Sequence, residues 1–294
     1  MARGAMTASL LPRLAPPLFV LIWATGFVAA RLVAPYADPL TFLSLRFAIA
    51  ALVLALAAAA FRAPWPATGR AWRDGLVAGA LLHGIYLGGV FWAVKHGLPA
   101  GIAALIAGLQ PLATGLLVGP WLGERVSRQR WIGIAVGALG AALVVAPKLG
   151  TADGFPPGPL AVCILGMLSI TVGTIWQKRT SGAADLRTNA VVQYLGALLV
   201  TGPLMLLLED GHLEPSVPLW IGLAWAVFVL SIGGIGLLLV LIRRGAVAGV
   251  AALLYLVPPV SALMAFALFG ETLNLVQIAG MVVAAAGVAI ASRG

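Results

Sequence analysis

Long apolar stretches alternate with short polar segments along most of the 294-residue chain. A helix needs about 20 predominantly apolar residues to cross the hydrocarbon core of a bilayer, and ten stretches approach or reach that length. The pattern therefore predicts an all-α membrane protein with ten membrane-spanning helices. The predicted spans are 14–33, 39–61, 73–94, 101–121, 128–146, 157–177, 188–208, 217–241, 246–269 and 274–291.

Lysine and arginine residues are spread unevenly over the segments between these spans. If the N-terminus is cytoplasmic, fourteen of them fall in cytoplasmic segments and three in outer segments. Because Lys and Arg accumulate on the cytoplasmic side of membrane proteins, both termini are predicted to be cytoplasmic. The cytoplasmic group is Arg3, Arg13, Arg62, Arg70, Arg73, Arg125, Arg128, Arg130, Lys178, Arg179, Arg187, Arg243, Arg244 and Arg293; the outer group is Arg31, Lys95 and Lys148; Arg46 lies inside the second span.

The segment 101–140 is repeated at 249–287. The matched positions are Gly101-x-Ala103-Ala104-Leu105 with Gly249-x-Ala251-Ala252-Leu253, Pro111 with Pro259, then, after a slip of one residue, Gly123-Glu124 with Gly270-Glu271, Gly133 with Gly280 and Gly140 with Gly287; Leu45-Arg46 matches Leu186-Arg187 more weakly. The match predicts two five-helix repeats, 1–147 and 157–294. Because five is odd, the second repeat enters the membrane inverted, and inverted repeats place a substrate site near the midplane between them.

The composition agrees with a membrane protein and excludes several other classes. The chain is 62% hydrophobic and 9% charged, whereas soluble domains carry about 25% charged residues. The net charge of +9 is explained by orientation in a lipid bilayer rather than by nucleic-acid binding. A single cysteine, Cys163, excludes an intrachain disulfide. No cofactor or metal motif is present, and no Walker motif that would indicate an ATP-driven motor.

Two other classes of membrane protein require features that this sequence lacks. A membrane-embedded enzyme would need an intramembrane Asp pair, an HExxH motif or a nucleophilic dyad, none of which occurs. A retinal-type receptor would need a lysine within a span, but Lys95, Lys148 and Lys178 all lie at span ends. The sequence therefore favours a transporter over an enzyme or a receptor.

Several local motifs resemble one transporter family over nearly the whole chain. They are Ile22-Trp23-Ala24-Thr25-Gly26-Phe27, Pro39 with Arg46-Phe47, Ala103-Ala104-Leu105-Ile106 with Gln110-Pro111, Leu122-Gly123-Glu124-Arg125, and Trp131-Ile132-Gly133. With the second-half copy they resemble the EamA family of the drug/metabolite transporter superfamily. The chain looks most like YddG-type exporters of aromatic and other neutral amino acids. The resemblance implies two inverted five-helix repeats in the cell inner membrane and export of metabolites.

Prolines occupy the middle of the fourth and ninth spans at matched positions, Pro111 and Pro258-Pro259. Proline removes a helix hydrogen bond and frees the carbonyl four residues earlier. Irregular backbone at membrane depth is tolerated where it is buried in protein or lines a wet cavity. The neighbouring Gln110 and Tyr255 are therefore predicted to bind substrate. The alternative is a packing kink without a ligand.

Three further side chains are predicted to line the cavity. His83 and Tyr86 are three residues apart on one helix face, and Trp23 lies well inside the first span. A buried histidine that only bonds a neighbouring helix is the alternative for His83. Most other tryptophans lie near span ends, where an interfacial belt is expected; they are Trp65, Trp72, Trp92, Trp121, Trp131, Trp176 and Trp220.

No carboxylate is predicted at the midplane. The acidic residues Asp38, Asp74, Glu124, Asp153, Asp185, Glu209, Asp210, Glu214 and Glu271 all fall in loops or at span ends. Proton-driven antiporters usually carry an intramembrane carboxylate relay. The pattern therefore favours neutral or zwitterionic substrates moved without ion coupling. His83 keeps open the alternative of a proton-coupled exporter of drugs, nucleobases or other metabolites.

Two charge pairs are predicted from the repeat. Arg46 and its counterpart Arg187 lie at opposite membrane faces, as do Glu271 and its counterpart Glu124. Arg46 with Glu271 at the outer side, and Arg187 with Glu124 at the inner side, are therefore candidate alternate gates. Local hydrogen bonding of Arg46 to helix carbonyls, or snorkelling to the interface, is the competing explanation.

Together these features predict alternating access by two repeats around a mostly apolar central cavity. The expected partners are the lipid bilayer and a small amino-acid-like substrate. The sequence leaves the oligomeric state open, a monomer included.

Overall fold

The computed structural model describes residues 2–114, 117, 127–145, 154–180, 185–234, 237 and 256–293, with only the backbone for 2–16, 291 and 292. Within these ranges the chain is helical, apart from short connections and an isolated antiparallel bridge between Ala37 and Leu213. The elements are α1 (Ala2–Val33), α2 (Pro39–Ala60), α3 (Gly69–Gly79), the π-helix η1 (Ala80–Ile85), α4 (Tyr86–Lys95), α5 (Ala100–Gly108), α7 (Arg128–Val145), α8 (Pro157–Thr180), α9 (Leu186–Leu208), α10 (Val217–Ala224), the π-helix η3 (Trp225–Gly234), α13 (Val257–Phe269) and α14 (Leu275–Ser292). The predicted all-α class is confirmed for this part of the chain.

Each of the ten predicted spans overlaps at least one described helix. Five helical stretches are long and apolar enough to cross a membrane by length and composition: Pro39–Ala60, Gly69–Lys95, Pro157–Thr180, Leu186–Leu208 and Val217–Gly234. Shorter apolar helices are Pro17–Val33, Ala100–Thr114, Val257–Phe269 and Leu275–Ile290. The count of ten stays a prediction, because parts of the fourth, eighth and ninth spans lie outside the described residues.

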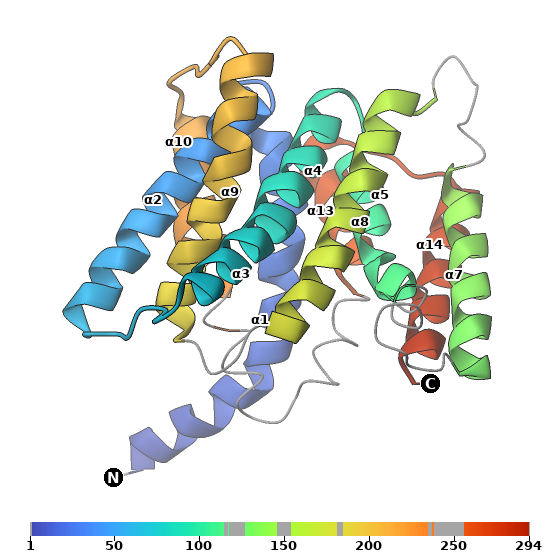
Figure 1. Ribbon diagram of the computed structural model, residues 1–294. Helices are drawn as coiled ribbons and strands as arrows, with labels where there is room; N and C mark the ends of the chain where they lie inside the picture. The colour runs from blue at the N-terminus through green and yellow to red at the C-terminus, as the bar shows by residue number, and fades with distance from the viewer. Residues whose placement is uncertain are drawn as a thin grey trace.

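The helices run side by side, and both chain termini lie at the same end of the molecule (Figure 1). The connections 34–38, 96–99, 209–216 and 270–274 lie at the opposite end, which we call the outer end after the predicted orientation. Contacts of these connections with one another and with the adjoining helix ends hold the outer end together. The cytoplasmic location of the termini remains a prediction.

The principal helix pairs join the first half of the chain to the second. Helix α2 packs on α9, α4 on α8, α5 on α13 and α7 on α14, and the last pair stands apart at one side of Figure 1. The contact of α2 with η3 has a counterpart in the contact of α9 with η1. An inverted repeat would produce this exchange of neighbours. In sequence order, α2 and α9 belong to the second predicted span of each half, and η1 and η3 belong to the third.

Glycines allow these pairs to approach closely. A Cβ atom at Gly140 would overlap the backbone of Ala284, and one at Gly287 would overlap the backbone of Gly137. Both glycines belong to the repeated motif, so the repeat motif itself forms the contact between α7 and α14. Close packing through small residues is a common basis of helix association in membranes.

The repeated prolines lie where the fourth and ninth predicted spans cross. Helix α5 ends at Gly108, and helical turns resume at 110–114, directly around Pro111. Helix α13 begins at Val257 with Pro258 in its first turn. A Cβ at Gly108 would lie 2.7 Å from Cγ of Pro258. The two proline sites therefore touch across the two halves. The residues before Leu256, including Tyr255, are outside the described part.

Candidate functional site

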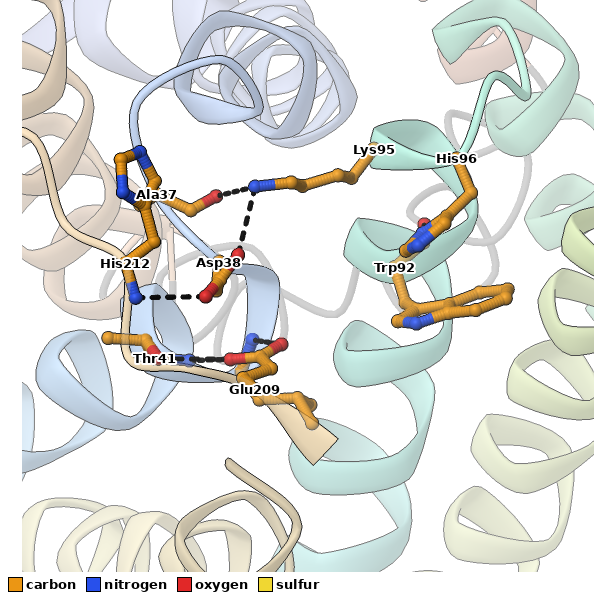
Figure 2. Close-up of polar contacts among 9 residues, drawn as sticks. Ala37, Asp38, Thr41, Trp92, Lys95, His96, Glu209 and His212 are labelled. Atoms are coloured by element: carbon orange, nitrogen blue, oxygen red, sulfur yellow. Dashed lines mark hydrogen bonds and ion pairs between the residues drawn. The ribbon is translucent and has the colours of Figure 1, made fainter. Parts of the chain in front are cut away.

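At the outer end, Asp38 links the two halves (Figure 2). Its carboxylate accepts hydrogen bonds from Nζ of Lys95 at 3.0 Å and from the backbone N–H of His212 at 2.9 Å. Lys95 also donates to the carbonyl of Ala37 at 3.0 Å. Because His212 belongs to the second half, this cluster holds the start of α2 to the connection between α9 and α10.

Glu209, from the second half, caps the first turn of α2. Its carboxylate accepts from the backbone N–H groups of Leu40 and Thr41, each at 2.8 Å, and from the hydroxyl of Thr41 at 2.9 Å. The first N–H groups of a helix lack partners within it, and a negative charge there is favoured by the helix dipole. The second half of the chain thus completes a helix of the first.

Glu271 forms a third outer link. Its carboxylate lies 3.4 Å from Nε of Arg31 and accepts from the backbone N–H of Ala100 at 3.0 Å. A cavity of about 220 Å³ lies beside it. The cavity lining is Pro99, Gly101, Ala262, Glu271, Thr272 and Leu273. The cavity opens between the two halves at their outer crossing.

We expect the Asp38 cluster to weaken only in acid. Partial burial acts to raise the pKa of Asp38, but the hydrogen bonds from Lys95 and His212 outweigh it and lower the pKa below its usual value. A carboxyl with a depressed folded pKa stabilises the folded state above its unfolded pKa of about 3.9, and this contribution is lost as pH falls through the folded pKa.

The corresponding test is the melting temperature of detergent-purified protein from pH 3 to pH 7. The melting temperature of wild type should exceed that of Asp38→Asn by a constant difference above about pH 5, and this difference should shrink below about pH 4. Lys95→Met should make this difference in melting temperature smaller above about pH 5, because it removes one of the bonds that lower the pKa of Asp38. A difference that grows as pH falls would contradict this account.

A second polar cluster lies deep among the helices. His83 in η1 lies 3.3 Å from Gln193 of α9, measured from Nε2 to Oε1. Arg46 of α2 donates from Nε to the hydroxyl of Ser231 in η3 at 3.1 Å. Tyr194 joins the two pairs: its hydroxyl donates to the carbonyl of Ser231 at 3.3 Å, and its ring lies 5.1 Å from the His83 ring. We call these five residues the central cluster.

The central cluster is related to the sequence repeat. In the register set by Gly101 with Gly249 and Pro111 with Pro259, the position equivalent to His83 is Ser231. Both residues lie in π-helical segments, η1 and η3. Each takes its polar partner from the other half. Because π-helical turns are rare and are frequently found at functional sites, their recurrence at equivalent positions marks this region as the candidate site.

Further polar side chains on the helices form hydrogen bonds between the two halves. The side-chain hydrogen bonds are Ser44 to Thr201 at 2.9 Å, Trp225 to Thr25 at 2.8 Å and Gln110 to Thr174 at 3.2 Å. Polar side chains within apolar spans are costly and usually face a neighbouring helix or a wet cavity. In the described structure, these polar side chains therefore meet at the interface between the two halves.

The predicted cavity residues take separate positions. His83 belongs to the central cluster, and Gln110 bonds Thr174. The ring of Trp23 lies 5.2 Å from that of Phe19, and Tyr86 is buried in α4. No hydrogen bond or ring contact joins these four to one another in the described structure. Their convergence around one substrate, together with Tyr255, stays a proposal.

The predicted pair of Arg46 and Glu271 is not formed in this conformation. Arg31, in the last turn of α1, reaches Glu271 instead. Arg46 is buried in α2 and bonds the hydroxyl of Ser231 in the second half, which is neither Glu271 nor a carbonyl of its own helix. Arg187 pairs with Asp185 at 2.9 Å, and Glu124 lies outside the described residues.

Sequence reasoning did not single out several residues of these sites. Gln193, Tyr194 and Ser231 were not selected, although the repeat register places Ser231 opposite His83. Asp38 and Glu209 were classified only as acidic residues at span ends. Their cross-half partners depend on which connections meet in space, and no motif signals that.

The comparisons with known proteins agree with this architecture. The EamA-like transporter family matches residues 17–146 and 158–293. The chain is 26% identical over 257 residues to "Uncharacterized inner membrane transporter YedA" of Escherichia coli strain K12, covering 87% of this chain and 82% of the relative. It is 27% identical over 282 residues to "Probable amino-acid metabolite efflux pump" of Salmonella typhimurium strain LT2, covering 93% and 92%.

A solved structure named only "Crystal structure of protein" superposes with a TM-score of 0.61 at 20% identity, covering 95% of both chains. This likeness shows a shared fold. The two family matches cover both halves of the chain and leave residues 147–157 between them. The chain therefore belongs to the EamA-like transporter family and is a multi-pass transporter of the inner membrane.

Proposed function

We propose that the chain exports small neutral or zwitterionic metabolites, with aromatic and other neutral amino acids as the substrate class. The observation that carries the proposal is the central cluster, which lies between the two halves and combines hydrogen-bonding groups with aromatic faces. The similarity to a relative named "Probable amino-acid metabolite efflux pump" supports the same class.

We propose alternating access as the mechanism, because the contacts between the halves at the outer end can separate. The outer links of Asp38, Glu209 and Glu271 join the halves through hydrogen bonds and ion pairs at partly exposed positions. An exposed ion pair such as Arg31–Glu271 contributes only about 0–1 kcal/mol, so it adds little to the free energy that substrate binding has to supply for opening. In this mechanism the substrate enters from the inner end, and the outer links break to release it.

We propose that transport is uncoupled. In the described structure Asp38, Asp185, Glu209 and Glu271 lie at helix ends or in connections, and Asp74 pairs with Arg73 near the inner start of α3. None joins the central cluster. The competing proposal is proton coupling through His83, which is favoured by its place in that cluster beside Gln193.

Counterflow in proteoliposomes tests the substrate class and the coupling. We expect unlabelled internal amino acid to drive uptake of labelled phenylalanine or another neutral amino acid without an imposed ion gradient. Strict dependence on a pH gradient, abolished in His83→Ala, would replace the uncoupled mechanism by the proton-coupled one. No counterflow with any neutral amino acid of the panel would contradict the substrate class.

A further inference from the structure

Arg46 differs from the described cations that form ion pairs at helix ends. Arg46 is only 6% exposed, yet none of the ion pairs in the described structure includes it. Arg31, Lys95 and Arg187 each pair with a carboxylate at a helix end. A guanidinium deep in a membrane protein is expected to pair or to face a functional cavity. Within the described residues, Arg46 therefore has no counter-charge, although its location calls for one.

The guanidinium also has unused donors. Of its five N–H groups, Nε donates to Ser231, and within the described residues Nη1 and Nη2 have no hydrogen-bond partner. Among the described residues nothing takes up these donors, so they can serve a small ligand that carries acceptor oxygens.

The surroundings suit the backbone of an amino acid beside an apolar or aromatic group. The guanidinium carbon lies 5.8 Å from the centre of the Phe47 ring, and that ring stacks on Tyr194 at 5.7 Å. Ser231, which holds Nε, lies in the π-helical segment η3. The guanidinium therefore lies at the interface between the halves, next to the segment equivalent to that of His83.

We propose that Arg46 binds the carboxylate of the transported amino acid, while Ser231 orients the guanidinium. The planar fork of an arginine matches the two oxygens of a carboxylate, and such charge-assisted bonds are about twice as strong as neutral ones. The substrate supplies the negative charge that the described helices lack. This inference rests on the proposed function and names the part of the substrate that the site recognises.

The test compares phenylalanine with phenylalanine amide, which lacks the carboxylate. Apparent affinities are taken from the ligand-dependent rise in melting temperature of the full chain in detergent. Wild type should bind phenylalanine about 10–100-fold more tightly than the amide. Arg46→Gln should lose this preference through weaker phenylalanine binding, with the amide unchanged. Arg46→Lys should keep part of it, since a lysine holds the charge but not the fork.

Arg128→Gln is the control, because Arg128 is exposed at the start of α7. It should keep the wild-type preference. If Arg46→Gln shows no cooperative melting, Ser231→Ala decides, since it removes only the hydroxyl that orients Nε and should reduce the preference several-fold.

The outcomes separate this inference from the proposed function. Phenylalanine counterflow together with equal binding of acid and amide by wild type would overturn the role of Arg46 and leave the transporter proposal intact. A preference that survives in Arg46→Gln would do the same. Failure of wild type to bind or transport any neutral amino acid would overturn the proposed function, and this inference with it.

Discussion

Oxidation of a cysteine pair placed at Ala37 and Leu213 should stop transport, and reduction should restore it. These residues form the isolated antiparallel bridge at the outer end. Hydrogen bonds from Asp38 to His212 and from Glu214 to Tyr36 flank them, so they are the non-hydrogen-bonded pair. Such pairs bring the Cα atoms to about 4.5 Å, within the range that a disulfide spans.

The physical reason is that this bridge joins the first half of the chain to the second. If the outer end must open to release substrate, a covalent link at the bridge prevents every cycle. The measurement is counterflow in proteoliposomes, with oxidant and then with reductant. The background carries Cys163→Ala, because Cys163 is the chain's one cysteine.

Each single-cysteine variant serves as a control and should transport at the same rate with and without oxidant. Full crosslinking, shown by a gel-shift assay, combined with undiminished transport would mean that the outer end does not separate at this bridge. In that case the outer links are structural, and the alternating-access proposal needs a different opening.

The helical fold follows from the sequence because the bilayer imposes a physical length. An apolar run such as 39–61 has to span the hydrocarbon core, and the structure places α2 at Pro39–Ala60. Local exceptions were not visible in that pattern. The π-helical turns at Ala80–Ile85 and Trp225–Gly234 contain no proline. In each turn a side-chain hydroxyl from another helix bonds a backbone carbonyl, Ser169 at Leu81 and Tyr194 at Ser231.

The candidate site was predictable only in part. His83 was selected because it lies inside an apolar span on the same helix face as Tyr86. Its contact with Gln193 of α9 fits both the predicted cavity role and the alternative of a buried histidine bonded to a neighbouring helix. Arg46 was selected because a charge inside a span is costly, but its predicted partner Glu271 was not the one found. Hydropathy and repeat register say on which side of the membrane a residue lies. They do not say which of two cations on that side reaches a carboxylate, and Arg31 does so here.

Replacing Gly196 by alanine should destabilise the protein, whereas the same change at Gly202 should not. Both glycines lie in α9. A Cβ at Gly196 would overlap the backbone of Leu76 in α3, and a Cβ at Gly79 would likewise overlap the backbone of Gln193. Nothing lies within 4 Å of the Cβ position at Gly202. The two substitutions therefore add the same methyl group at a crowded and at an open position of one helix.

Backbone atoms cannot rotate away as a side chain can, so Gly196→Ala must push α9 and α3 apart. Overpacking of this kind typically costs about 1–3 kcal/mol, whereas Gly202→Ala should gain up to about 1 kcal/mol from the higher helix propensity of alanine. The melting temperatures of the two variants in detergent measure the difference.

Transport by the folded fraction of Gly196→Ala gives a second readout. Gly79 precedes His83 by one helical turn, and Gly196 follows Gln193 by about one turn, so the close approach of α3 and α9 sets the 3.3 Å contact between His83 and Gln193. Separation of the helices should break this contact and lower the transport rate per folded molecule. Equal melting temperatures and equal transport in both variants would show that α9 shifts freely against α3, and that the central cluster does not depend on their close packing.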